Sequence, residues 1–318
     1  MKNKAWLEYT ATDEDVGRTV EQILKETLNI SGRMIQRLTR SKGIQLNRKA
    51  PFLKREVKVG DRISVRITDQ KPPGAIPPVH AGAIEAPVPI LFEDQLFLVV
   101  NKPAGMPVHP TNPSQTGTLV QQLAAYLEAQ GATPHAVHRL DKETTGTVLI
   151  AKSSYAHQLA DKLLRANELH REYLAIVTGE VSEAKGAKET INQPIARDPN
   201  HSTRRRVHPN GDAAITHYEV MESHESGSLV QVELETGRTH QIRVHFAWLG
   251  HPLLGDTLYG GKKSGFYRAA LHASKLAFTH PVTQESISVE ATLPNDFQSY
   301  FQNHFQQQLS ATAKGDFL

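Results

Sequence analysis

The sequence predicts an α+β protein in which a small basic α/β domain precedes a larger domain of mixed strands and helices. Three observations support this fold class. Amphipathic helical segments and short apolar strands follow one another without a regular βαβ repeat. A segment rich in Pro, Gly and Ala divides the chain, and positive charge is concentrated before it. The length of 318 residues suits about two domains.

The domain boundary is predicted from a break in sequence pattern at residues 71–87. This stretch, KPPGAIPPVHAGAIEAP, has no helical or strand periodicity, and each proline fixes φ and removes a backbone donor. We therefore expect a basic domain over 1–75, a linker over 76–87, a larger domain over 88–300 and a tail over 301–318. The tail is rich in Gln and is expected to be a frayed helix or disordered.

Two helices and a strand are expected in the N-terminal domain. The first helix is indicated by Val20, Ile23 and Leu24, which stand at helical spacing. The second helix lies in ISGRMIQRLTRSKG, with Ser31 as its N-cap and Gly43 at its end. The segment DRISVRI alternates between apolar and polar residues and predicts a half-buried strand.

Arginines are expected on the outward faces of the second helix and the strand. The helix places three of them at i, i+4 and i+7 on one face, and the strand points two away from its apolar side. They are Arg33, Arg37, Arg40, Arg62 and Arg66. Residues 31–66 hold 11 basic and 2 acidic residues, and residues 1–75 carry a charge of +7 within a total of +3. A solubilising face usually mixes both signs, so this patch favours a phosphate backbone as its partner.

The larger domain is predicted to contain four strands and three helices in irregular order. The strands are expected at LFLVVNK (96–102), TGTVLIAKS (145–153), REYLAIVTGEV (171–181) and LVQVELETG (229–237). The helices are expected at TGTLVQQLAAYLEAQG (116–131), SSYAHQLADKLLRANEL (153–169) and THQIRVHFAWLG (239–250). The strand at 171–181 is apolar on both faces and is expected at the centre of a sheet. The last helix turns Ile242, Phe246 and Leu249 inward, with Gly250 just past its end.

Several function classes lack their signatures in this sequence. The absence of cysteine excludes disulfides, a cysteine nucleophile and thiolate metal sites. There is no GxGxxG, HExxH or GxSxG motif, and GDTLYGGKKSG (255–265) has Gly261 where a phosphate loop would have Lys. We therefore expect no nucleotide cofactor, no metal and no other cofactor. No secretory signal or membrane-spanning run is seen, so we expect a cytoplasmic protein without a membrane partner.

Five stretches of the larger domain resemble the RluA family of pseudouridine synthases. They are VVNKPAGMPVHP (99–110), HRLDKETTG (138–146), REYLAIVTGE (171–180), GRTHQIRVHFAWLGHPLLGDTLYG (237–260) and LHASKLAFTHP (271–281), in the family's order. The N-terminal domain looks like the αL RNA-binding motif. The resemblance implies a pseudouridine synthase catalytic domain on a mixed, largely antiparallel sheet with flanking helices. It also implies an isomerase that works on RNA without a cofactor.

The resemblance further implies the site residues. Asp141 would be the catalytic carboxylate, kept ionised and oriented by Arg243. Tyr173 would pack on the target base and take part in proton transfer, although its strand alone predicts a core tyrosine. Arg139 would occupy the space left by a flipped uridine, with pairing to Asp141 as the alternative. Whether Asp141 attacks the sugar or removes a proton stays open at this point.

The combination of an αL-type domain with this catalytic domain is typical of enzymes that act on large-subunit ribosomal RNA. We therefore expect ribosomal RNA as the substrate, with transfer RNA as the alternative for the same chemistry. A non-catalytic RNA-binding or ribosome-assembly factor is the alternative from a different class. The intact set of Asp141, Tyr173 and Arg243 favours the enzyme.

Overall fold

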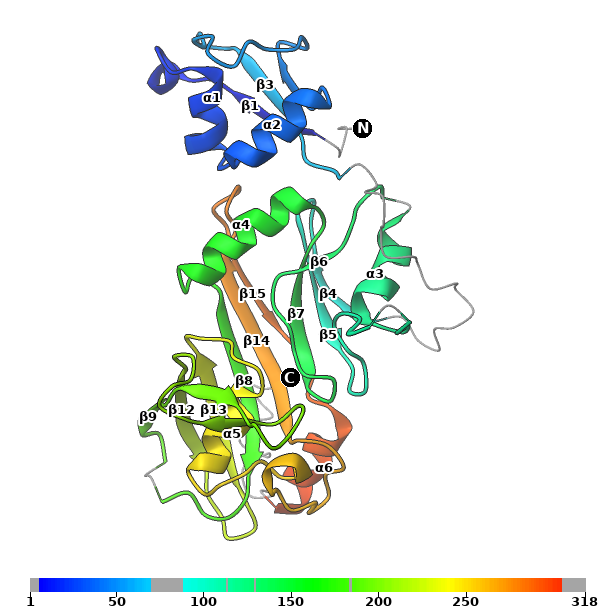
Figure 1. Cartoon of the computed structure of the whole chain (residues 1–318), viewed down its shortest axis with the longest axis vertical. Helices are drawn as coiled ribbons and strands as arrows, with labels where there is room; N and C mark the ends of the chain where they lie inside the picture. Colours follow the sequence, from blue (N-terminus) through cyan, green and yellow to red (C-terminus); the bar gives the residue numbers. More distant parts are fainter. Residues whose placement is uncertain (1–5, 70–87, 113, 129, 183–184, 305–318) are drawn as a thin grey trace.

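The computed structural model describes residues 6–69, 88–112, 114–128, 130–182 and 185–304. The elements form a small N-terminal unit and a larger unit along the long axis of the molecule (Figure 1). The linker expected at 76–87 lies outside the described residues. Of the expected tail, residues 301–304 belong to the last helix, and the rest lies outside.

The N-terminal unit is a three-stranded antiparallel sheet with helices packed on it. The strands lie in the order β1 (Trp6–Thr10), β3 (Arg62–Arg66) and β2 (Ile44–Leu46). Helix α1 (Val20–Gln22) runs into a π-helical turn (Ile23–Thr27), and α2 (Gly32–Arg40) follows. The single helix predicted from Val20 is therefore partly a wider turn, which brings Leu28 to the buried side occupied by Ile23. Ser31 caps α2 as predicted, because its hydroxyl accepts from the Met34 N–H.

The larger unit is built on a ten-stranded mixed sheet. Its main path is β4 (Ile90–Glu93), β5 (Phe97–Lys102), β7 (Thr145–Ala151), β14 (Leu271–Thr279), β8 (His170–Val177), β13 (Ser228–Leu234), β12 (Ile215–Glu222) and β9 (Lys188–Asn192), while β15 (Ser286–Glu290) pairs with β14 and β6 (His135–Ala136) with β7. Every pairing is antiparallel except that of β7 with β14. The expected mixed, largely antiparallel sheet is confirmed, and β8 lies near its centre as predicted.

Four helices flank this sheet, and a short ribbon lies beside one of them. The helices are α3 (Leu119–Glu128), α4 (Ser154–Arg165), α5 (Gln241–Trp248) and α6 (Asn295–His304). The ribbon consists of β10 (Ile195–Arg197) and β11 (Arg205–Val207) and contacts α5. Ser153 caps α4, and Gly250 takes a φ of 90° just past α5, both as predicted. Within the described residues, no helix is long and apolar enough to cross a bilayer.

Helix α4 lies between the N-terminal unit and the large sheet (Figure 1) and contacts the N-terminal unit directly. The Tyr155 hydroxyl, buried on α4, donates to the Leu28 carbonyl of the N-terminal unit at 3.0 Å. Gln158, also on α4, donates to the Asn29 carbonyl at 2.6 Å. One apolar cluster contains residues of both units, among them Leu28, Ile30, Met34, Tyr155, Ala156 and Leu159. The N-terminal unit is therefore packed against the larger one and not held by a chain connection alone.

Candidate active site

A cavity of about 470 Å³ lies between the loop that precedes β7, strand β8, the end of β13 and helix α5. Its lining includes Asp141 and Arg139 from the loop, Tyr173 from β8 and Arg243 from α5. The structure thus brings together all four of the residues predicted for the catalytic domain. Asp141 and Arg243 are 102 positions apart in the sequence and are in direct contact here.

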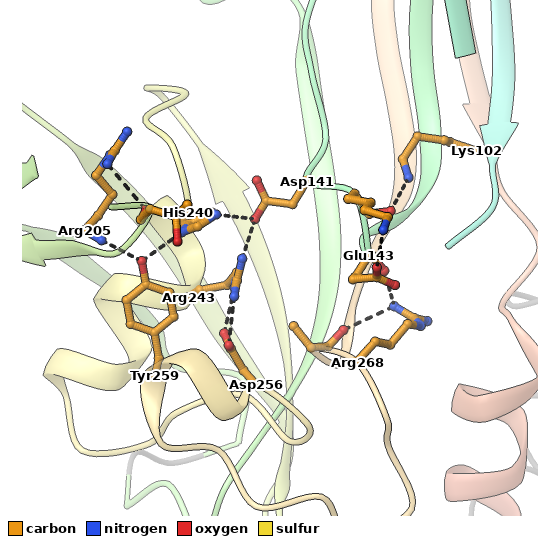
Figure 2. A network of polar contacts seen from close by, with 12 residues as sticks. Lys102, Asp141, Glu143, Arg205, His240, Arg243, Asp256, Tyr259 and Arg268 are labelled. Atoms are coloured by element: carbon orange, nitrogen blue, oxygen red, sulfur yellow. Dashed lines mark hydrogen bonds and ion pairs between the residues drawn. The ribbon is translucent and has the colours of Figure 1, made fainter. Parts of the chain in front are cut away.

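Arg243 is held by two carboxylates at once, as Figure 2 shows. Its Nη1 donates to Asp141 Oδ2 at 2.9 Å, while Nε and Nη2 donate to the two oxygens of Asp256 at 2.7 and 2.8 Å. Burial by itself lowers the pKa of Arg243, but the bonds and charge of Asp256, joined by Asp141, raise the pKa well above its usual range. The guanidinium is therefore always charged, and Asp256 fixes the plane in which it meets Asp141.

The two oxygens of Asp141 have different surroundings. Oδ2 accepts the bond from Arg243 and lies 3.7 Å from His240 Nε2. Oδ1 has no hydrogen-bond partner among the described residues, and the side chain is 19% exposed toward the cavity. One oxygen is thus anchored, and the other is free to act on a bound molecule.

His240 faces the anchored oxygen and is oriented from behind by Tyr259 (Figure 2). Its Nδ1 lies 2.8 Å from the Tyr259 hydroxyl, and that hydroxyl accepts from the Arg205 N–H at 2.9 Å. Burial lowers the pKa of His240 by more than the charge of Asp141 raises it, so the ring is neutral near pH 7. The Tyr259 hydroxyl thus holds Nδ1, and Nε2 is the ring nitrogen that faces Asp141.

Tyr173 lines the cavity from the centre of the sheet and is only 4% exposed. Burial raises the pKa of its hydroxyl, and the charge of Arg171 opposes that rise only in part. The phenol therefore stays protonated at neutral pH and offers a polar hydrogen and an aromatic ring to the cavity. Tyr173 is thus buried in the core, as its strand alone predicts, and it also lines the cavity.

Two buried basic side chains hold the backbone that follows Asp141 (Figure 2). The fully buried Lys102 donates from Nζ to the Lys142 carbonyl at 3.0 Å, and Arg268 donates from Nη1 to the Glu143 carbonyl at 3.1 Å. Lys102 also donates to two carbonyls of the turn after β5. The loop that carries Asp141 is thereby held at the backbone carbonyls of two consecutive residues, Lys142 and Glu143.

Just after this loop, strand β7 approaches β14 so closely at Gly146 that only glycine fits. Gly146 has a φ of 113°, and a Cβ at this position would lie 2.1 Å from the Ala273 carbonyl oxygen on β14.

Arg268, which bonds to the Glu143 carbonyl of the loop, is itself anchored by two hydrogen bonds to Asp296 of α6. The C-terminal helix therefore contributes to the position of the loop.

Arg139 is exposed at the cavity and makes no hydrogen bond or ion pair with any of the described residues. The alternative of a pairing between Arg139 and Asp141 is not seen, because Arg243 takes the carboxylate. Arg139 is thus available to a ligand that enters the cavity.

The five arginines predicted to face outward differ in their contacts. Arg33, Arg37, Arg40 and Arg62 are exposed as predicted, whereas Arg66 is half-buried. Arg37, although 56% exposed, also donates to the Ser154 hydroxyl of α4 at 2.6 Å, and Arg66 donates to the carbonyl and hydroxyl of Ser41. Both border a cavity of about 170 Å³ between the units. The expectation of five outward arginines did not foresee this, because the packing of α4 against the N-terminal unit has no signature in the sequence.

Sequence patterns did not reveal five of the residues that build this site. His240, Asp256 and Tyr259 lie in the same family-like stretch as Arg243, and Lys102 lies in another, so the resemblance was the one signal for them. Arg268 lies outside the quoted stretches and had no signal. Within the part of the chain that the structure describes, no three His, Asp or Glu side chains gather as metal ligands.

Comparison with known proteins supports the same family over both units. A model described as RNA pseudouridylate synthase matches residues 96–248, and one described as the RluD ribosomal pseudouridine synthase N-terminal domain matches residues 7–63. A Bacillus subtilis (strain 168) protein named "Uncharacterized RNA pseudouridine synthase YhcT" is 42% identical over 303 residues, which cover 94% of this chain and 97% of that protein. Ribosomal large subunit pseudouridine synthase D of Haemophilus influenzae is 35% identical and covers 89% of this chain, with 90% of its own length matched.

Solved structures agree with this assignment at the level of the fold. Human RNA Pseudouridylate Synthase Domain Containing 1 is 26% identical with a TM-score of 0.56, covering 75% of this chain and 100% of that one. Human RNA Pseudouridylate Synthase Domain Containing 4 is also 26% identical, with a TM-score of 0.54, covering 67% of this chain and 92% of that one. The chain therefore belongs to the RluA family of RNA pseudouridine synthases, which are isomerases.

Proposed function

We propose that this protein converts specific uridines of large-subunit ribosomal RNA into pseudouridine, with Asp141 as its catalytic carboxylate. The single observation that carries the proposal is the position of Asp141 and the way in which Arg243 holds it. It lies in a cavity with Oδ2 anchored by a permanently charged arginine and with Oδ1 free of described partners. A carboxylate held in this way is oriented for chemistry on a bound sugar.

The reaction is an internal rearrangement of the nucleotide. The bond between N1 of the base and C1′ of the ribose breaks, the base turns, and C5 bonds to C1′. C5 loses a proton and N1 takes one up, so no atom is gained and no electron donor or group donor is required. This balance suits a site built from side chains, and we propose that it needs no cofactor.

Each side chain has a distinct part in this proposal. Asp141 acts through Oδ1, either on C1′ or on a neighbouring sugar proton, and both routes need the same ionised group. Arg243 maintains its charge and orientation. Tyr173 presents a protonated phenol and a ring face on which the uracil stacks. Arg139 enters the gap that the flipped uridine leaves, where a planar guanidinium can stack on the neighbouring bases.

The substrate class is supported by two independent features. Relatives similar over most of the chain are named ribosomal large subunit pseudouridine synthase D. The N-terminal unit exposes Arg33, Arg40 and Arg62, which would contact phosphates of a large folded RNA. Transfer RNA is the alternative substrate. An enzyme of ribosomal RNA would work in the cytoplasm, where ribosomes are made.

The decisive experiment is pseudouridine mapping of total RNA from cells that carry the wild-type gene, no gene, or the Asp141→Asn variant. We expect one or more sites in large-subunit ribosomal RNA to be lost both without the gene and with Asp141→Asn. The matched control is Glu290→Gln, whose carboxylate forms an exposed ion pair with Lys275 and does not line the cavity. Sites that are lost only from transfer RNA would redirect the substrate assignment. Full modification with Asp141→Asn would remove Asp141 from the mechanism.

A further inference from the structure

His240 carries a hydrogen-bond donor that the protein itself does not use. Its Nε2 lies 3.7 Å from Asp141 Oδ2, which is beyond a hydrogen bond. No other acceptor among the described residues bonds to it. The side chain is 14% exposed and borders the cavity. The Nε2–H therefore points into the space beside the carboxylate and is available to a ligand.

The protein fixes this donor by two devices. Tyr259 holds Nδ1 and accepts from the backbone N–H of Arg205, so we assign the proton of its hydroxyl to Nδ1, which leaves the ring proton on Nε2. The backbone of His240 has a φ of 59°, in the left-handed region that non-glycine residues rarely occupy. This strain persists at the start of α5 because Gln241 is bound to Thr236 and to the Arg238 N–H. A strained, oriented and unused donor at a cavity indicates a ligand contact.

We propose that His240 is a specificity-determining residue that donates from Nε2–H to the 2′-hydroxyl of the target uridine. This inference rests on the proposed function. In an RNA chain, the 3′ and 5′ oxygens are esterified, so the 2′-hydroxyl is the only free hydroxyl of the ribose. It stands on the carbon next to C1′, where Asp141 would act. The donor of His240 and the carboxylate lie on the same side of the cavity, within reach of one sugar.

A hydroxyl also matches the chemistry of the space between the two side chains. It accepts a hydrogen bond from His240 and donates one to the Asp141 carboxylate, whereas the 2′-hydrogen of deoxyribose does neither. A 2′-hydroxyl contact is the means by which proteins distinguish RNA from DNA at a given nucleotide. His240 does not serve as a base here, because Nδ1 is occupied by Tyr259 and the nitrogen that faces the cavity carries a proton.

The test compares two synthetic ribosomal RNA fragments that carry the mapped target as uridine or as 2′-deoxyuridine. Single-turnover reactions with enzyme in excess give the enzyme concentration at half-maximal rate for the uridine RNA. The deoxyuridine RNA is added as a competitor to give its inhibition constant. The variants are His240→Asn, which lacks a donor at the Nε2 position, and His240→Gln, whose amide NH₂ reaches that position.

We expect His240→Asn to raise the half-maximal concentration for the uridine RNA about tenfold, as for one lost hydrogen bond. The inhibition constant of the deoxyuridine RNA should change less than about twofold, a result that a misfolded protein would not give. His240→Gln should recover most of the loss. Equal weakening for both RNAs, or no weakening for either, would overturn the inference while leaving the proposed function intact. A wild-type protein that modifies neither RNA nor cellular ribosomal RNA would overturn the proposed function itself.

Discussion

Arg243 and Asp256 form a bidentate pair inside the protein, with hydrogen bonds of 2.7 and 2.8 Å and side chains only 12% and 2% exposed. The pair leaves one terminal nitrogen of the guanidinium for Asp141. Asp256 thus acts on the site indirectly, because it orients Arg243, and Arg243 in turn orients the Asp141 carboxylate. Such an arrangement depends on the planar fork of arginine, which lysine does not have.

Replacement of Arg243 by Lys should lower the single-turnover rate of pseudouridine formation by about 100-fold or more, since an ammonium cannot satisfy Asp256 and Asp141 together. RNA affinity, measured by filter binding, should change less than about threefold. Arg18→Lys is the matched control, because Arg18 also bonds to two carboxylates, those of Asp15 and Glu26, and does not line the cavity. A fully active Arg243→Lys protein would show that the fork geometry is unimportant.

Gly146→Ala should lower the free energy of unfolding by about 3 kcal/mol or more, because the added methyl group would meet the Ala273 carbonyl of the neighbouring strand. Gly105→Ala is the matched control. Gly105 also has a positive φ, of 79°, but its Cβ would meet no atom within 4 Å, so we expect a loss of about 1–2 kcal/mol. Urea unfolding followed by circular dichroism measures both losses. Equal losses would contradict the role of the close contact between β7 and β14 at Gly146.

Stability in acid should depend on Asp69, which accepts bonds from His135 and Ser154 near the junction of the two units. Burial raises the pKa of Asp69, but these hydrogen bonds outweigh burial and lower the pKa below its ordinary value of 3.8. The ionised carboxylate therefore contributes stability that is fully present above pH 3.8 and is lost as the pH falls through the lower folded-state pKa. In urea unfolding, wild type should exceed Asp69→Asn in stability at pH 7 and at pH 5, and the difference should shrink below pH 3.8. A constant difference down to pH 2.5 would contradict this.

The exposed arginines of α2 should dominate the salt dependence of RNA binding. The double variant Arg33→Ala/Arg40→Ala should reduce the slope of log affinity against log salt by about two units, roughly one for each lost phosphate contact. Arg37→Ala serves as the control on the same helix. Its guanidinium is exposed as well, but it is already paired with the Ser154 hydroxyl and with Asp69, so the slope should stay near that of wild type. An equal loss of slope in both proteins would mean that Arg37 also meets the RNA.

Elements with strong local signals were predicted well from the sequence. The caps at Ser31 and Ser153, the stop at Gly250 and the central position of β8 follow from hydrogen-bonding groups and apolar runs within a few residues. The π-helical turn after Gln22 was not foreseen, because its apolar spacing also fits a regular helix.

The site was predictable only in part, for a related physical reason. Asp141, Tyr173, Arg139 and Arg243 meet at one cavity as expected, although distant motifs and not local charge pointed to them. The supports of these residues are tertiary contacts. Lys102 and Arg268 bond to backbone carbonyl oxygens. Every residue has such an oxygen, so the sequence of the loop carries no sign of these contacts. The use of Arg37 at the junction likewise depends on how two units pack.

Helix α4 sets a fixed distance between its contact with α2 and the cavity. Ser154 at the start of α4 receives Arg37, the N-terminal unit contacts the helix as far as Lys162, and Leu164 and Arg165 at its end border the cavity. Twelve helical residues span roughly 18 Å at 1.5 Å per residue, and helical backbone does not stretch. Under the proposed function, an RNA bound by the exposed arginines of α2 would meet the cavity at this fixed distance. A uridine would then reach Asp141 only where the fold of the RNA places it at that distance, so the shape of the substrate would contribute to its selection.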